Sequence, residues 1–404
     1  MGKASILLVL GYSVILLVIG FNLQDFGTRS VENYIDYYEQ SAAHNIALCG
    51  ANLAANQLFI DPSWREGYDV TPFAQGTFTV TVDTLPEGLL KVTSIGKYYE
   101  LKKTITFVLQ PSTFAKFAYF TNIEGAIWWV SKDTVWGPFH TNSKMRIYGS
   151  PVFYGKVTTR LGIYGQRYRR YRRYNRAKFY GGYESGVKVD LPNDLSKLIA
   201  AANGGRKFEK TDVWLTFNAD ETVSWKTSAT GPETTEKLTS FAPNGVILAE
   251  KGNMHIKGTV NGKVTVSATG SSGLGLGNVY VDDDIVYAQD PRTEPSDDML
   301  GIAVDNNVII TENPQNNNDV RVQATIFCRS GGFTAEKYNT RPPSGIIDLL
   351  GGLIMDQRGP VGTFSRRGIR SGFSKRYRYD DRFMVTAPPF FPTTGKYEIL
   401  SWLE

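Results

Sequence analysis

The sequence has few of the residues from which disulfide frameworks and histidine metal sites are built. Its 404 residues include two cysteines, Cys49 and Cys328, and three histidines. We interpret the cysteines as small buried residues rather than as a disulfide, since Cys49 falls on the apolar face of a predicted helix. Metal ligation by histidine would need more than His44, His140 and His255. The sequence therefore predicts no metal and no other cofactor.

Charge is absent from the stretch Ala4 to Gln24, "ASILLVLGYSVILLVIGFNLQ". A helix of this length spans a hydrocarbon core of about 30 Å. A cleaved secretory signal is the alternative, but its apolar part is usually about 7–15 residues long and ends at a small-x-small site. The span therefore predicts an uncleaved membrane anchor. Lys3 precedes it and acidic residues follow it, so the positive-inside rule predicts a single-pass inner-membrane protein, with the amino terminus in the cytoplasm and the body in the periplasm or at the cell surface.

Acidic residues are also absent from residues 167–178, which carry seven positive charges among tyrosines. This segment and the basic segment 366–382 together carry +12, whereas the whole chain carries +5, so the remainder carries −7. Two localised basic patches on a mildly acidic body indicate a localised partner. Outside the cell we expect that partner to be an acidic surface of another envelope subunit or of the chain itself, an acidic polysaccharide or lipid head groups, and not nucleic acid. The candidate contact residues are Arg167, Tyr168, Arg169, Arg170, Tyr171, Arg172, Arg173, Tyr174, Arg176 and Lys178.

Proline is absent before Pro62, and an apolar stripe at helical spacing continues beyond the anchor. The stripe consists of Val31, Ile35, Tyr38, Ala42, Ile46, Cys49 and Leu53, and a small-residue row of Ala43, Ala47, Ala51 and Ala54 lies beside it. The pattern predicts one helix of about 55 residues, about 80 Å long, whose second half packs on a globular head through the small residues. A core helix that merely adjoins an anchor is the alternative.

The apolar helix running into "SAAHNIALCGANLAANQLF" and then into a small β meander resembles the minor-pilin-like pilus assembly proteins of bacteria. The resemblance covers about the first 110 residues. It implies an envelope location and subunit partners. The chain departs from type IV prepilins, because Gly2 is followed by "KASIL" without a glutamate five residues in. The resemblance therefore does not extend to peptidase processing or to insertion into a pilus shaft.

Beyond the helix the sequence predicts two kinds of β structure. Alternating segments from Thr77 to Gln110 predict a three-stranded antiparallel meander. Residues 253–268 alternate strictly, with the even positions apolar or glycine, and short apolar runs without helices between them follow to residue 354. This pattern predicts a β-solenoid with one strand face buried, and a β-sandwich is the alternative. An internal sequence repeat supports the solenoid: "KMRIYG" is followed by "GKVT" at 144–158, and "NMHIKG" is followed by "GKVT" at 253–265.

These patterns divide the chain into six segments. They are an anchor and pilin-like helix (1–60), a meander (61–110), a first part of the solenoid (111–160), an insertion with the Tyr/Arg segment and a short helix at 192–203 (161–243), the main solenoid (244–360) and a basic, aromatic tail (361–404). Two segments resemble the solenoid domain of an uncharacterised family of pilin-like envelope proteins: "GPFHTN" at 137–142 and the sequence from "NGVILAE" to "GFTAE". The tail is either a strap on the body or a docking segment for another subunit.

Few residues are grouped in a way that indicates an active site. His140 is predicted to be a hydrogen-bonded turn histidine, and Asp282–Asp284 and Asp297–Asp298 are predicted to lie in solvated turns, with calcium binding as the alternative. The glycine-rich stretches lack the lysine of a P-loop and are predicted turns. The main hypothesis is a non-enzymatic structural or assembly component of the envelope. The alternatives are a β-helix enzyme acting on acidic polysaccharide and a surface adhesin.

Overall fold

The chain forms two compact units in a computed structural model. Unit 1 consists of Met1–Ser112 and Gly395–Glu404, and unit 2 consists of Thr113–Thr394. The structure describes all residues except 1, 132, 166–175, 193–194, 366–367 and 404. The chain is mainly β, with one long apolar helix at the amino terminus, as the sequence predicts.

Unit 1 is a long helix packed on an antiparallel sheet. Helix α1 (Gly2–Ile60) has 59 residues without a break, in agreement with the absence of proline. The sheet extends the predicted meander at both edges; its strand order is β1 (Tyr68–Phe73), β2 (Gly76–Thr84), β3 (Leu90–Tyr98), β4 (Leu101–Thr113) and β30 (Thr393–Leu403). Strands β1 to β4 pair antiparallel.

The carboxy-terminal strand belongs to this sheet and is a strap on the chain's own body. Trp402 in β30 stacks on the buried ring of Phe107 in β4, with 4.8 Å between the ring centroids. Tyr397 accepts a hydrogen bond from Arg65 at 3.0 Å. Residues 395–404 thus complete unit 1, although they are more than 280 residues away from β4 in the sequence.

Unit 2 is a β-solenoid with three runs of parallel strands. The parallel pairing excludes the sandwich alternative. The first run is β15 (Arg206–Glu209), β19 (Val246–Glu250), β21 (Lys263–Thr269), β23 (Met299–Val304), β25 (Val320–Cys328), β27 (Pro343–Gln357), β5 (Tyr119–Ile123), β8 (Phe139–Thr141), β11 (Val157–Thr159) and β14 (Tyr183–Ser185). The second is β22 (Val279–Tyr287), β25, β27, β29 (Gly368–Arg378), β7 (Thr134–Trp136), β10 (Val152–Phe153) and β13 (Lys178–Phe179). The third is β16 (Val213–Phe217), β20 (Met254–Val260), β22, β24 (Val308–Ile310) and β26 (Phe333–Ala335).

Smaller elements flank these runs. Strands β17 (Thr222–Lys226) and β18 (Thr234–Lys237) extend β16 antiparallel, and β28 (Gly362–Ser365) pairs antiparallel with β29. A separate parallel sheet contains β6 (Trp129–Val130), β9 (Met145–Tyr148) and β12 (Ile163–Gly165). At the β15 end, α2 (Ser196–Ala201) and α3 (Leu238–Phe241) bury Leu198 and Phe241 in the core, whereas β13 and β14 pair on one side only among the described residues.

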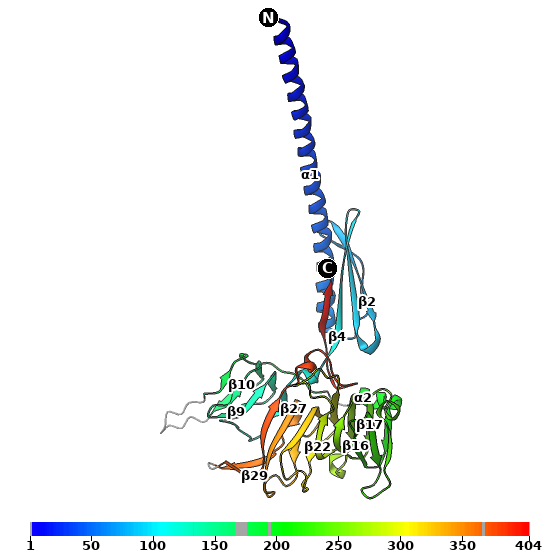
Figure 1. Cartoon of the computed structure of the whole chain (residues 1–404), viewed down its shortest axis with the longest axis vertical. Helices are drawn as coiled ribbons and strands as arrows, with labels where there is room; N and C mark the ends of the chain where they lie inside the picture. The colour runs from blue at the N-terminus through cyan, green and yellow to red at the C-terminus, as the bar shows by residue number, and fades with distance from the viewer. Residues whose placement is uncertain (1, 132, 166–175, 193–194, 366–367, 404) are drawn as a thin grey trace. The chain divides into compact units, whose positions relative to one another are not determined.

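The coils do not stack in chain order. The chain enters the solenoid in its middle at β5, runs out to β14, and returns at the far end through β15 (Figure 1). It then runs back until β27 and β29 pair with β5 and β7. Entry and exit therefore lie side by side, and Phe114 N–H donates to the Pro392 carbonyl at 3.0 Å.

The alternating segment 253–268 forms β20 and β21, with its apolar even positions facing the core. The expectation of one buried face is wrong for β21, because Thr265 and Ser267 are buried as well. The cause for Thr265 is the segment before β30, whose Pro389 carbonyl accepts a hydrogen bond from the Thr265 hydroxyl at 2.5 Å. The two copies of the repeated "GKVT" motif lie at β11 and β21, in the same run of parallel strands.

Candidate functional site

The second half of α1 packs on its sheet through the predicted small-residue row. Ala43, Ala47, Ala51 and Ala54 are completely buried. A β-carbon at Gly96 in β3 would lie 2.3 Å from the carbonyl oxygen of Ala43, so only glycine permits this approach. The Ser94 hydroxyl donates a hydrogen bond of 2.7 Å to the Ala47 carbonyl. Small side chains thus bring the helix backbone close to the strand.

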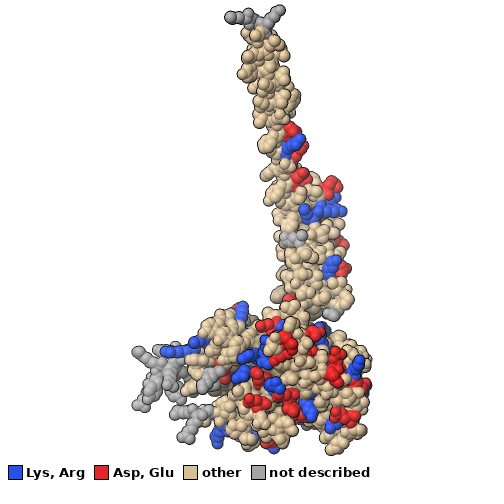
Figure 2. All heavy atoms as spheres, viewed as in Figure 1, with Lys and Arg blue, Asp and Glu red and all other residues tan. Residues whose placement is uncertain are grey.

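The neighbouring apolar stripe, by contrast, does not pack throughout. Leu53 is 43% exposed, and Val31, Ile35 and Tyr38 are exposed as well. Cys49, predicted to be buried, is half-buried, whereas Cys328 is buried. Residues 4–38 of α1 are exposed, and Figure 2 shows no charged side chain along the first part of the helix below its grey tip. One helix in the part of the chain that the structure describes is long and apolar enough to cross a membrane.

The Tyr/Arg segment joins β12 to β13 in the last coil of the solenoid. Its residues Arg167 to Tyr174 lie outside the described residues. Arg176 and Lys178 are described and exposed, and their backbone N–H groups donate to Gly149 and Pro151 at 2.9 Å each. The solenoid therefore fixes the carboxy-terminal flank of the segment.

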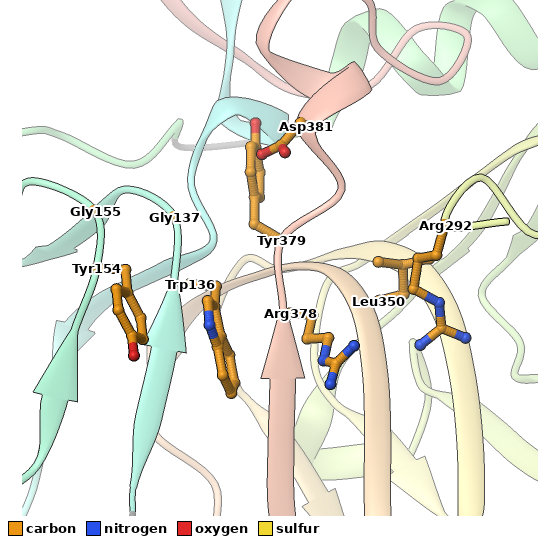
Figure 3. A pocket seen from close by; sticks show the side chains of 9 residues that line it. All are labelled: Trp136, Gly137, Tyr154, Gly155, Arg292, Leu350, Arg378, Tyr379 and Asp381. Carbon is orange, nitrogen blue, oxygen red and sulfur yellow. The ribbon is translucent and has the colours of Figure 1, made fainter. Parts of the chain in front are cut away.

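A pocket opens on the second run of parallel strands, and its lining includes none of the contact residues predicted from the sequence (Figure 3). Its volume is about 640 Å³, and it is lined by Trp136, Gly137, Tyr154, Gly155, Arg292, Leu350, Arg378, Tyr379 and Asp381. The rings of Trp136 and Tyr154 stack at 5.9 Å between centroids, and Tyr154 stacks on Tyr180 at 5.2 Å. The Arg378 guanidinium lies 5.5 Å from the Trp136 ring centroid.

The charges at this pocket differ in how far they are neutralised. Arg292 is paired with Asp290 at 2.5 Å, and this contact lowers the pKa of Asp290 to about 2. Arg378 and Asp381 are exposed and form no ion pair with another described residue. The pocket thus offers one cation, one carboxylate and aromatic edges to a ligand.

Inside the solenoid lies a buried ion pair, which sequence analysis did not identify. Arg358 donates to the Glu124 carboxylate at 2.9 Å, and both side chains are less than 5% exposed. The Arg358 guanidinium also lies 4.1 Å from the Trp129 ring centroid. Burial and then the Arg358 charge lower the pKa of the nearby Lys375 to about 8. Because Arg358 and Glu124 lie in the core, we interpret the cluster as structural.

Two predicted turn sites lie in strands instead. His140 is buried in β8, where its ring nitrogens contact Thr158 at 2.7 Å and Asn142 at 3.1 Å. Asp282, Asp283 and Asp284 lie in β22. Asp282 forms a hydrogen bond with His255 in β20, and Asp284 forms an ion pair with Arg321 in β25. Both β20 and β25 pair with β22. Cross-strand pairing therefore replaces the expected solvated turn.

Asp298 and the glycine-rich stretch 270–277 have structural roles within the fold. Asp298 is buried and accepts hydrogen bonds from the N–H groups of Gly262 and Gln289. The glycines of "GSSGLGLG" form turns, as predicted, with Gly275 and Gly277 at positive φ. No group of three or more His, Cys, Asp or Glu residues within the described ranges is placed to hold a metal ion.

Comparisons with known proteins give two findings. Residues 91–161, from β3 to just after β11, match a family described as a domain of unknown function (DUF4900). The chain is also similar to the crystal structure of the competence-associated pilin ComZ from Thermus thermophilus, with 13% identity, 90% of this chain and 97% of that chain covered, and a TM-score of 0.36. No match was found among curated proteins. The long apolar helix that packs on an antiparallel sheet is a pilin-like arrangement, in line with the resemblance seen in the sequence.

Proposed function

We propose that the chain is a membrane-anchored, non-enzymatic structural or assembly component of the bacterial cell envelope. The observation that carries this proposal is the division of helix α1. Its amino-terminal part is apolar and exposed, and its carboxy-terminal part is buried against the sheet of unit 1 through alanines. An exposed, charge-free stretch of some 20 residues belongs in a membrane or among other apolar helices.

Orientation follows from the charges at the two ends of the apolar stretch. Lys3 precedes it, and Asp25 and Glu32 follow it on the same helix. We infer a cytoplasmic amino terminus and a body in the periplasm or at the cell surface. A protease added outside spheroplasts should then digest the chain after about residue 30. Protection of the full-length chain in intact spheroplasts, with digestion after lysis, would contradict this orientation.

We further propose that the Tyr/Arg segment contacts an acidic surface of another envelope subunit. Its described flank, Arg176 and Lys178, is exposed at the last coil of the solenoid. Arginine suits such a contact because its planar guanidinium binds carboxylates in pairs. The remainder of the chain, with a net charge of −7, makes a second copy one candidate for that surface.

The test is the size of the native complex after mild detergent extraction. Replacing Arg169, Arg170, Arg172 and Arg173 by Gln should shift the complex toward smaller species, and raised salt should do the same to the wild type. A matched control replaces four exposed lysines near the other end of the solenoid by Gln: Lys210, Lys237, Lys251 and Lys257. An equal effect of both variants would mean that assembly depends on the net charge of the chain and not on this segment. Normal assembly of the arginine variant would refute the contact.

A further inference from the structure

Four side chains on the outer face of the solenoid form one straight row across four consecutive strands. Trp136 is aligned with Arg378 in the register of β29 and β7. Val135 is aligned with Phe153, and Phe153 with Phe179, so Tyr154 and Tyr180 continue the row. We call Arg378, Trp136, Tyr154 and Tyr180 the ladder strip. The three aromatic residues lie within residues 134–180, whereas Arg378 lies in β29. Only the fold brings these four side chains together.

Trp136 and Tyr154 present ring edges and polar atoms rather than ring faces, whereas Tyr180 is stacked on one face among the described residues. The three aromatic rings stack on one another with interplanar angles of 12° and 13°, and Arg378 covers the outer face of Trp136. Trp136, Tyr154 and Tyr180 are nevertheless 37%, 49% and 63% exposed. Solvent therefore meets their edges, including two phenol hydroxyls, while the indole N–H and the guanidinium can donate hydrogen bonds.

An extended peptide cannot add a strand to β7 or β10, because both strands are already paired on each side. Strand β7 lies between β29 and β10, and β10 lies between β7 and β13. Along β7 and β10 a ligand must therefore be recognised by side chains. The ring centroids of the row lie 5.9 Å and 5.2 Å apart, which is slightly more than the spacing of parallel strands of about 4.8 Å and is comparable to the length of one sugar ring in a linear chain.

We propose that the ladder strip and the adjoining pocket bind a linear polysaccharide that carries carboxylates and lies along the solenoid axis. Hydroxyl groups of successive sugars meet the phenols and the indole N–H, and apolar C–H groups lie on the ring edges. Arg378 is the carboxylate partner, since it is exposed and forms no ion pair with another described residue, whereas Arg292 is occupied by Asp290. Beside the strip, beyond the carboxyl end of β29, Asp381 can accept hydrogen bonds from sugar hydroxyls (Figure 3). This inference goes beyond the assembly role and does not depend on it.

The experiment measures binding of a fluorescein-labelled oligogalacturonate to the full chain in detergent by fluorescence anisotropy. It uses the variant with Arg169, Arg170, Arg172 and Arg173 replaced by Gln, so that the Tyr/Arg segment does not contribute. Arg378→Gln should weaken binding about tenfold, as expected for one lost charge-assisted hydrogen bond. Tyr180→Ala should also weaken it. A neutral malto-oligosaccharide of equal length should bind more weakly than the oligogalacturonate.

Two matched controls separate the strip from charge and aromatic content in general. Arg376→Gln removes an exposed arginine from the same strand, and Tyr148→Ala removes a half-exposed tyrosine from β9. Neither should change the affinity. Absence of binding, equal losses in Arg376→Gln and Arg378→Gln, or unchanged affinity in the strip variants would overturn the proposal. Smaller native complexes of the strip variants, without any glycan binding, would overturn it too and identify a protein contact instead.

Discussion

At the scale of single residues, the strongest prediction concerns the ion pair inside the solenoid. Glu124 accepts hydrogen bonds from Arg358 at 2.9 Å and from the Thr121 hydroxyl at 2.6 Å. Glu124→Gln removes the carboxylate that pairs with the buried guanidinium, so we expect a loss of about 3–5 kcal/mol in the free energy of unfolding. Urea unfolding followed by tryptophan fluorescence measures it. The exposed pair of Glu312 and Lys337 is the control, and Glu312→Gln should have little effect. Similar losses in both variants would mean that burial does not matter.

A second prediction at this scale concerns pH and His140. Burial lowers the pKa of His140 below its ordinary value of about 6.5, and the hydrogen bond with Asn142 opposes this shift only in part. Below about pH 6.5 the unfolded chain therefore binds more protons at this histidine than the folded chain does. The stabilising contribution is therefore complete above about pH 6.5 and is lost as the pH falls toward the folded-state pKa. Melting temperatures measured between about pH 7.5 and 5.5 should fall less steeply in His140→Gln than in the wild type. Identical pH dependence would contradict the buried neutral histidine.

At the scale of secondary structure elements, the packing of α1 can be tested directly. Ala47 is completely buried, and Gly96 lies against its backbone. Ala47→Leu inserts three carbon atoms into this contact and should lower the stability of unit 1 by about 1–3 kcal/mol. Leu53→Ala, at an exposed position of the same helix, is the matched control and should change it little. Thermal unfolding in detergent measures both, and wild-type melting of Ala47→Leu would mean that the helix can move away from β3.

Secondary structure can be predicted from the sequence where apolar residues recur with a helical or strand period. The sequence does not show which of two neighbouring residue rows on a helix packs against the sheet. A charge-free run and unbroken helical spacing predict α1, and strict alternation predicts the buried face of β20. The same helical spacing ranks Leu53 and Cys49 with the core, yet the close approach of Gly96 places the alanine row inward instead. The ladder strip could not be predicted, because its four residues are aligned by strand register and not by spacing along the chain.

At the scale of the whole molecule, the order of the coils is the feature that sequence patterns do not contain. Alternation and glycine turns predict a solenoid, but each coil would stack equally well on its neighbour in the sequence. The chain instead begins in the middle, at β5, and closes the gap with β27 and β29 at the end. The coils from β5 to β14 therefore cannot complete their stack until about 200 further residues are present. Late pairing of distant strands is typical of slow folding.

This topology predicts that two halves of the chain fold only together. If the chain is divided between Asp190 and Leu191, the first fragment holds β5 and β7, and the second holds β27 and β29, which pair with them. The second fragment also supplies β30 to the sheet of β4. Co-expressed fragments should therefore copurify in a 1:1 complex from detergent, and each alone should aggregate because it exposes unpaired strands. A second fragment that ends at residue 342 lacks β27, β29 and β30 and should not copurify. Two soluble fragments that do not associate would show instead that each run of coils is a stable solenoid by itself.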